Sequence, residues 1–138
     1  GFAYEYGGDV FDNFSMEQYA WSQRPLVLFA PSPEHSVARE QRKRVAAARE
    51  GFNERDMVLI EVYQDRVLAG GLTYGKPSAV TMRQQFRVDA DATAVILVGK
   101  DTTEKSRDPG PVLMDNIFGQ IDAMPMRRDE MRRNRYGE

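Results

Sequence analysis

Cysteine is absent from this chain of 138 residues. Without a thiol, the protein can form no disulfide, no thiolate metal site and no thiol redox centre. Histidine is nearly absent as well, since His35 is the only one. The sequence therefore excludes thiol chemistry in every form, and a histidine-dependent site would have to be built on one residue.

The chain also lacks long apolar runs and a strong net charge. No run approaches the roughly 20 residues that span a bilayer, so we expect no membrane span. The first residues do not join a basic region to an apolar core, so they predict no signal peptide. The formal net charge of −2 argues against a general nucleic-acid binder, and we expect no nucleic-acid partner. The length and the 41% of hydrophobic residues predict a single globular domain.

Residues 24–52 are the stretch around which the chain is organised. The apolar run 26–30 has the length and composition of a strand that is covered on both faces. Two prolines end this strand, and Ser32 is a suitable N-cap for a charged helix from about 33 to 50. Gly51 is a suitable residue to end that helix. The sequence therefore predicts a strand, a Pro-Ser-Pro turn and a long helix in succession.

A second strand is predicted at 57–63, where Glu61 is the one charged residue in an apolar run. A buried Glu61 would need a partner, and we expect Arg24 or Lys100 to supply it. The other predicted elements are a short helix at 16–21, a glycine-rich loop at 64–77, a helix at 78–87, a strand at 93–99, a polar edge strand ending near 107 and a helix at 112–124. We expect Ser78 to cap the helix at 78–87, with Val80, Met82 and Phe86 facing inward. After Pro125, the tail is predicted to be either a charged helix or disordered.

The order of these elements predicts the fold class. A right-handed crossover makes the first two strands parallel, and the later hairpin adds antiparallel strands. We therefore expect an α/β, thioredoxin-like three-layer sandwich, with a central mixed sheet of about four strands flanked by helices. The expected segments are an N-terminal strap at 1–23, the thioredoxin-like domain at 24–125 and a basic C-terminal tail at 126–138.

Several stretches together resemble a known family. They are RPLVLFAPSP, DMVLIEV, QQFRVDADATAVILVGKDTTEK and IDAMPMRRDEMRR, and IDAMPMRR is the most distinctive piece. On these stretches the chain is identified as a member of the DUF4174 family, a domain of unknown function with a thioredoxin- or peroxiredoxin-like fold. It also resembles the domains of coiled-coil domain-containing protein 80 and the sushi-repeat proteins. The resemblance implies a periplasmic or secreted protein after leader removal, with a cytoplasmic location as the alternative.

Comparison with active thioredoxins fails at the redox site. Their Cys-x-x-Cys pair would fall at residues 34–37, and their cis-proline precedes the third strand, where this chain has Ala92 and Thr93. A cis peptide bond before a residue other than proline is rare and costly, so we expect none at Ala92. We therefore expect neither thiol oxidoreductase nor peroxidase activity, and no cofactor.

The scaffold nevertheless offers a binding surface. The resemblance implies that extended peptides are recognised beside the first helix and at the loop before the third strand. The residues predicted to bind are Pro31, Ser32, Pro33, Glu34, His35, Asp91, Ala92 and Thr93. The leading hypothesis is a non-catalytic binding module with a protein or peptide partner, and we assign no catalytic or metal-ligating residue.

Two other functions stay open. In one, the protein is an enzyme that uses no thiol, with Glu34 and His35 as acid–base or metal groups. In the other, it is an envelope or matrix protein that acts by self-association. The stretch 70–78 approaches the phosphate-binding pattern G-x-x-x-x-G-K-[ST], but Pro77 stands where the metal-binding hydroxyl belongs. We interpret that stretch as a surface turn.

Overall fold

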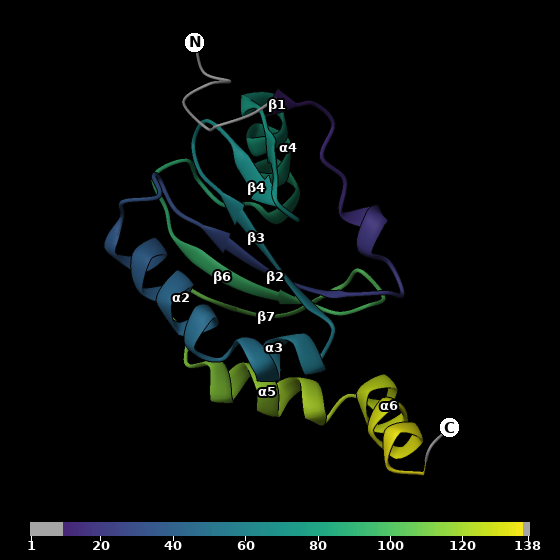
Figure 1. Cartoon of the computed structure of the whole chain (residues 1–138). Coiled ribbons are helices and arrows are strands. Elements are labelled where there is room, and N and C mark those ends of the chain that lie inside the picture. Colours follow the sequence, from purple (N-terminus) through teal and green to yellow (C-terminus); the bar gives the residue numbers. More distant parts are fainter. Residues whose placement is uncertain (1–9, 137–138) are drawn as a thin grey trace.

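A seven-stranded mixed sheet forms the centre of the molecule (Figure 1). The computed structural model describes residues 10–136, so residues 1–9 of the predicted strap lie outside the described part. The strands lie in the order β1-β5-β4-β3-β2-β6-β7. Their bounds are β1 Val10–Phe11, β2 Arg24–Phe29, β3 Met57–Val62, β4 Val67–Ala69, β5 Leu72–Tyr74, β6 Ala94–Val98 and β7 Glu104–Asp108.

Strand β2 lies between β3 and β6. It is parallel to β3 and antiparallel to β6, and β7 completes an antiparallel edge hairpin with β6, as predicted. The sheet has seven strands rather than about four, because β4, β5 and β1 extend it beyond β3. The turn that joins β4 to β5 contains Gly70 and Gly71, at φ 58° and 77°. Glycine adopts this left-handed conformation without a steric penalty, which allows a tight turn between two strands. Part of the predicted loop at 64–77 is therefore the hairpin of β4 and β5.

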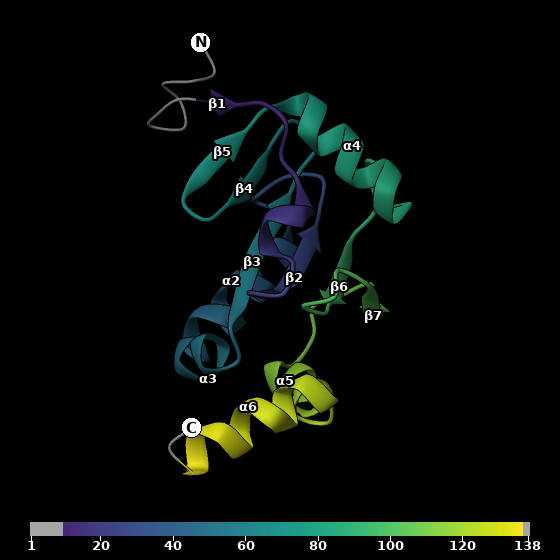
Figure 2. The same cartoon turned by 90° about the vertical axis from the view of Figure 1, so that its right-hand side faces the viewer.

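Helices cover both faces of the sheet, as Figures 1 and 2 show, and they confirm the three-layer α/β class. They are the 3₁₀-helix η1 Met16–Tyr19 and the α-helices α2 Ser36–Ala47, α3 Arg49–Glu54, α4 Lys76–Phe86, α5 Met114–Asp122 and α6 Pro125–Tyr136. On one face, η1 and α4 bury Val27 and Phe29 of β2. On the other face, α2, α3 and α5 bury Leu26 and Leu28. Within residues 10–136, no helix is long and apolar enough to cross a membrane.

Helix α2 begins later and ends earlier than predicted. A turn closed by the His35 N–H on the Ser32 carbonyl, at 3.2 Å, occupies the place of the predicted first helical turn. His35 is therefore the N-cap instead of Ser32. Ala48, with a φ of −113°, separates α2 from α3. Gly51 lies inside α3, where a Cβ atom would meet the Phe118 ring at 2.8 Å, so the glycine permits close packing of α5.

Helix α4 also begins at another residue than predicted. Gly75 is its N-cap, and Ser78 is buried inside the helix. The Ser78 hydroxyl instead accepts a hydrogen bond from the backbone N–H of Phe14 at 3.0 Å. Phe14 and Tyr19 are buried in the same core as α4, so the described part of the N-terminal segment packs onto the domain.

A cluster of charged side chains, here called the α6 ion cluster, lies where β2 begins. Its members are Arg24, Glu54, Arg55, Asp56, Lys100, Asp122, Arg127 and Glu130. The Arg24 guanidinium donates two hydrogen bonds to the Glu130 carboxylate, at 3.1 and 2.9 Å, and the Lys100 ammonium donates a third at 2.8 Å. Of the two alternatives for the tail, the structure has the helix. The cluster holds α6 at the end of the molecule opposite α4 (Figure 2).

Two carboxyl groups of the α6 ion cluster have lowered pKa values. Burial alone raises the pKa of Glu130, but the hydrogen bonds from Arg24 and Lys100 outweigh burial and leave that pKa below its ordinary value. The hydrogen bond from Arg55 lowers the pKa of Asp122, and burial offsets only part of this effect. The folded protein therefore favours the charged form of both groups.

The expected partners of Glu61 are wrong. Its carboxylate accepts a hydrogen bond from the Tyr63 hydroxyl at 2.6 Å and lies 3.8 Å from the Arg42 guanidinium. Residues 61 and 63 project from the same face of β3, and α2 packs over that face with Arg42. Arg24 and Lys100 belong to the α6 ion cluster instead.

Candidate functional site

The two predicted binding segments lie side by side where β2 ends. Because β2 and β6 are antiparallel with Phe29 opposite Ala94, the residues that follow β2 adjoin those that precede β6. Gln64, just beyond β3, connects the two segments. Its backbone N–H donates to the Pro31 carbonyl at 3.2 Å, and its side-chain Nε2 donates to the Ala90 carbonyl at 2.9 Å. The structure therefore brings the two segments together at one edge of the sheet.

In the first segment, residues 31–35, the structure leaves Glu34 exposed and the other side chains half-buried. The Nδ1 atom of His35 accepts a hydrogen bond from the Val37 backbone N–H at 3.2 Å. Nδ1 is therefore the acceptor that caps the first turn of α2. With Nδ1 engaged in capping the helix, the enzymatic alternative gains no support from His35.

In the second segment, residues 91–93, Asp91 is exposed, and Ala92 and Thr93 are half-buried. The Thr93 hydroxyl donates a hydrogen bond to the Pro109 carbonyl at 2.8 Å, which ties the segment to the chain that follows β7. Among residues 10–136, the cis peptide bond is Gly110-Pro111. The bond before Thr93 is therefore trans, as expected without a proline.

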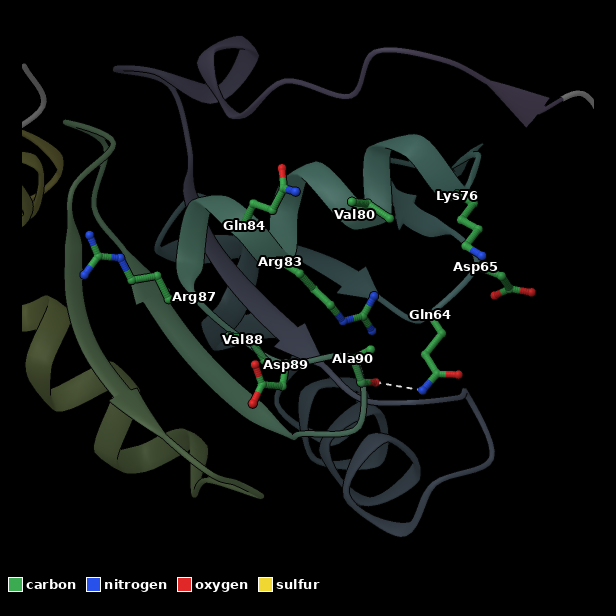
Figure 3. Close-up of a pocket in the computed structure, with 10 residues that line it drawn as sticks. All are labelled: Gln64, Asp65, Lys76, Val80, Arg83, Gln84, Arg87, Val88, Asp89 and Ala90. Carbon is green, nitrogen blue, oxygen red and sulfur yellow. Dashed lines mark hydrogen bonds between the residues drawn. The ribbon is translucent and has the colours of Figure 1, made fainter.

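A groove of about 750 Å³ opens beside the two segments, between α4, the chain after β3 and the chain before β6 (Figure 3). Its lining includes Gln64, Asp65, Lys76, Val80, Arg83, Arg87, Asp89 and Ala90. Figure 3 shows Lys76 and Asp65 at one end and Arg87 at the other, with the Arg83 guanidinium turned toward Gln64 and Ala90. None of the predicted binding residues lines this groove, but it adjoins both segments through Gln64 and Ala90.

Arg83 is the most unusual residue of the groove, because its side chain is only 7% exposed. Its two terminal nitrogens donate to the backbone carbonyls of Tyr63 and Ala30, at the ends of β3 and β2. Its Nε atom is buried and has no hydrogen-bond partner among the described residues. Burial lowers the pKa of Arg83, and the charge of Asp65 offsets only part of this effect.

Sequence reasoning placed Met82 and Phe86 correctly on the inner face of α4, but it missed Arg83 because it took Val80 for the third inward residue. Val80 was expected to face inward, but it is 41% exposed. The buried residues of α4 include Ala79, Met82, Arg83 and Phe86, which follow the i, i+3, i+4, i+7 spacing of one helix face. That spacing was the available signal, and it was hidden because an arginine is rarely placed in a core.

The glycine-rich stretch 70–78 does not form a phosphate-binding loop. Its residues are divided among the β4–β5 turn, strand β5 and the first turn of α4. A phosphate-binding loop instead runs directly from a strand into a helix. In the part of the chain that the structure describes, no three Asp, Glu or His side chains are grouped so that they could hold a metal ion.

Solved structures similar to this chain include peroxiredoxins, so the comparison identifies the fold that the sheet and its helices form. The reduced 2-Cys peroxiredoxin of Plasmodium vivax matches with a TM-score of 0.62 and 16% identity, over 83% of this chain and 84% of the other. The thioredoxin peroxidase I of Plasmodium yoelii matches with a TM-score of 0.62 and 17% identity, over 91% and 82%. A mutant of peroxiredoxin 6 from Arenicola marina matches with a TM-score of 0.59 and 19% identity, over 84% and 71%. At such identities, the likeness establishes a peroxiredoxin- or thioredoxin-like fold and nothing about activity.

The particular family follows from the sequence itself. The profile of a domain of unknown function, DUF4174, matches residues 15–130, and the chain belongs to that family. The match confirms the resemblance found in the sequence. The matched range includes both predicted binding segments, the groove beside α4 and the Glu130 end of the α6 ion cluster.

Proposed function

We propose that the protein is a non-catalytic binding module that holds an extended peptide segment of a partner protein against residues 31–35 and 91–93. The observation that carries this proposal is the pairing of Phe29 with Ala94, which sets the two segments side by side. Ligands of open α/β sheets bind outside the carboxyl ends of the strands, which is where both segments lie. The chain has no cysteine with which to perform thiol chemistry at this edge.

The way the two segments are held also supports binding. Gln64 is hydrogen-bonded to Pro31 of the first segment and to Ala90, the residue directly before the second segment. Thr93 ties the second segment to the chain after β7, and His35 ties the first to α2. A surface that is ordered before it meets its partner loses little conformational entropy on binding. The exposed carboxylates of Glu34 and Asp91 add polar groups at the rim of this surface.

A peptide selection tests the proposal. Peptides selected from a random library on the wild-type chain are titrated into the isotope-labelled protein, and the changes in backbone amide resonances are mapped. We expect the largest changes at residues 32–35 and 91–93. The bulky Ser32→Trp and the charge-reversing Asp91→Arg should each weaken the selected peptides by about tenfold or more, which is about 1.4 kcal/mol.

The matched control is Lys43→Glu, a charge reversal on the exposed side of α2. It should leave the affinity within about twofold of wild type, since exposed charges outside a contact contribute little. Resonance changes confined to another surface, or unchanged affinity in both site variants, would contradict the proposed site.

A further inference from the structure

Arg83 differs from the other buried cations in how its charge is balanced. The described residues contain four buried cationic side chains: Arg24, Arg83, Lys100 and Arg127. The other three each form ion pairs with carboxylates of the α6 ion cluster. Arg83 forms no ion pair with a described residue, and Asp65 acts on it only at longer range.

The hydrogen bonds of Arg83 do not replace a counter-ion. Its terminal nitrogens are bonded to the carbonyls of Tyr63 and Ala30, which carry only partial charges, and its Nε–H has no acceptor. A buried charge without an opposite charge, like a buried donor without an acceptor, is costly and therefore uncommon. The guanidinium also borders the groove beside α4, so a ligand in that groove can approach it.

The charges around the groove favour an anion. Its lining carries three cations, Lys76, Arg83 and Arg87, and two acids, Asp65 and Asp89. Asp65 also forms an ion pair with Arg66 at 3.1 Å, so the surroundings of the groove carry more positive than negative charge. A carboxylate reduces that excess, and its planar shape matches the two-pronged geometry of a guanidinium better than phosphate does. The apolar side chain of Val80 and the backbone at 88–90 leave room for a neighbouring part of a peptide.

We propose that the groove beside α4 binds a carboxylate of a peptide, either an Asp or Glu side chain or a C-terminal carboxylate, as the counter-ion of Arg83. The peptide nature of the ligand rests on the proposed function, while the preference for a carboxylate does not. The competing explanation is that Arg83 is only a structural clamp between the ends of β2 and β3. A clamp predicts no acidic ligand and gains nothing from an added negative charge.

A titration separates a carboxylate ligand from the clamp. The probes are Ac-Gly-Glu-Gly-NH2, the same peptide with Gln in place of Glu, Ac-Gly-Gly-Gly with a free C-terminus, and inorganic phosphate. The Nε–H resonance of Arg83 and the amides of 88–90 report binding. We expect saturable shifts with one or both carboxylate peptides, and affinity on the order of tenfold weaker for the Gln peptide. Equal responses to the Glu and Gln peptides with no response to the free C-terminus, responses to phosphate alone, or no response at the Arg83 resonance would overturn the proposal.

A carboxylate placed within the chain provides the second test, because substituting Arg83 itself also removes its hydrogen bonds to the carbonyls of Tyr63 and Ala30 and so destabilises the fold. Val80 lies one turn before Arg83 on α4 and lines the groove, so Val80→Glu brings a carboxylate toward the guanidinium. We expect it to raise the midpoint of urea unfolding and to abolish the Arg83 response to the acidic peptides. The control Thr81→Glu adds the same charge to the exposed side of α4 and should do neither. Equal midpoints for the two variants, or undiminished peptide binding by Val80→Glu, would overturn the carboxylate site.

The two proposals can fail separately. If selected peptides map to residues 32–35 and 91–93 but the acidic probes bind no better than the neutral one, the binding module is supported and the carboxylate site is refuted. If Arg83 responds to the acidic peptides but no selected peptide maps to the two segments, the carboxylate site is supported and the binding module is refuted.

Discussion

Removing the negative charge of Glu130 should strongly destabilise the protein. Glu130→Gln keeps the size of the side chain, but it leaves the Arg24 guanidinium, which is 1% exposed, without its carboxylate. Removing one partner of a buried ion pair typically costs about 3–5 kcal/mol. Lys100 and Arg127 keep other carboxylates, and the amide still accepts one hydrogen bond, so we expect a loss near the lower limit, about 3 kcal/mol.

Urea unfolding followed by circular dichroism measures this loss, and a thermal scan should show a midpoint lower by about 10 °C for a domain of this size. The control is the adjacent Asp129→Asn, which removes an ion pair with Arg132 whose side chains are 61% and 50% exposed. Such a pair contributes less than about 1 kcal/mol. If Glu130→Gln and Asp129→Asn lose the same free energy of unfolding, the α6 ion cluster does not stabilise the fold as argued.

Two further predictions concern stability. Because the pKa values of Glu130 and Asp122 are lower in the folded than in the unfolded chain, their contribution is full above about pH 5, where both groups are also charged in the unfolded chain, and is lost as the pH falls through the folded values. The midpoint of urea unfolding should therefore fall as the pH is lowered, and it should fall less steeply in Glu130→Gln than in the wild type. Equal slopes of midpoint against pH in the two proteins would refute this cause. Gln41 is fully buried and forms two hydrogen bonds with the Val112 backbone, at 2.6 and 3.2 Å, so Gln41→Leu should cost about 2 kcal/mol in the same assay. The control Lys43→Ala, at an exposed position, should change the free energy of unfolding by less than about 0.5 kcal/mol. An equal loss in Gln41→Leu and Lys43→Ala would contradict the role of Gln41.

The longest apolar runs made the core of the fold predictable from sequence. Strands β2, β3 and β6 are each five or six residues long, and all their residues are buried or half-buried, so their composition identified them. Strands β1, β4 and β5 have two or three residues, too few to display an alternating pattern. Helix starts were misplaced at Ser32 and Ser78, because both serines looked like N-caps. Ser32 instead begins a local turn that its carbonyl closes with the His35 N–H, and the Ser78 hydroxyl accepts a hydrogen bond from the distant Phe14 N–H.

The candidate site was predictable only in part, for a different reason. The proximity of residues 31–35 and 91–93 follows from topology, which the order of elements determines. The groove depends on the orientation of one side chain, Arg83, whose acceptors are backbone carbonyls of two strands. Likewise, the partner of Glu61 depended on where Arg42 of α2 crosses β3. The spacing of apolar residues in α4 indicates the face on which Arg83 lies, but the acceptors of Arg83 and the partners of Glu61 are set by three-dimensional packing.

Strand β2 also anchors the proposed binding edge in the most stable part of the sheet. Every residue of β2 is buried, and the strand is bonded to β3 on one side and β6 on the other, so its amides exchange with solvent only when the whole domain unfolds. The Ala30 amide is still bonded to Val62, whereas the turn at 31–35 begins at the next residue. The proposed site is thus anchored in the part of the molecule that opens last. A partner that binds there can slow the motion of the turn without having to order the strand that supports it.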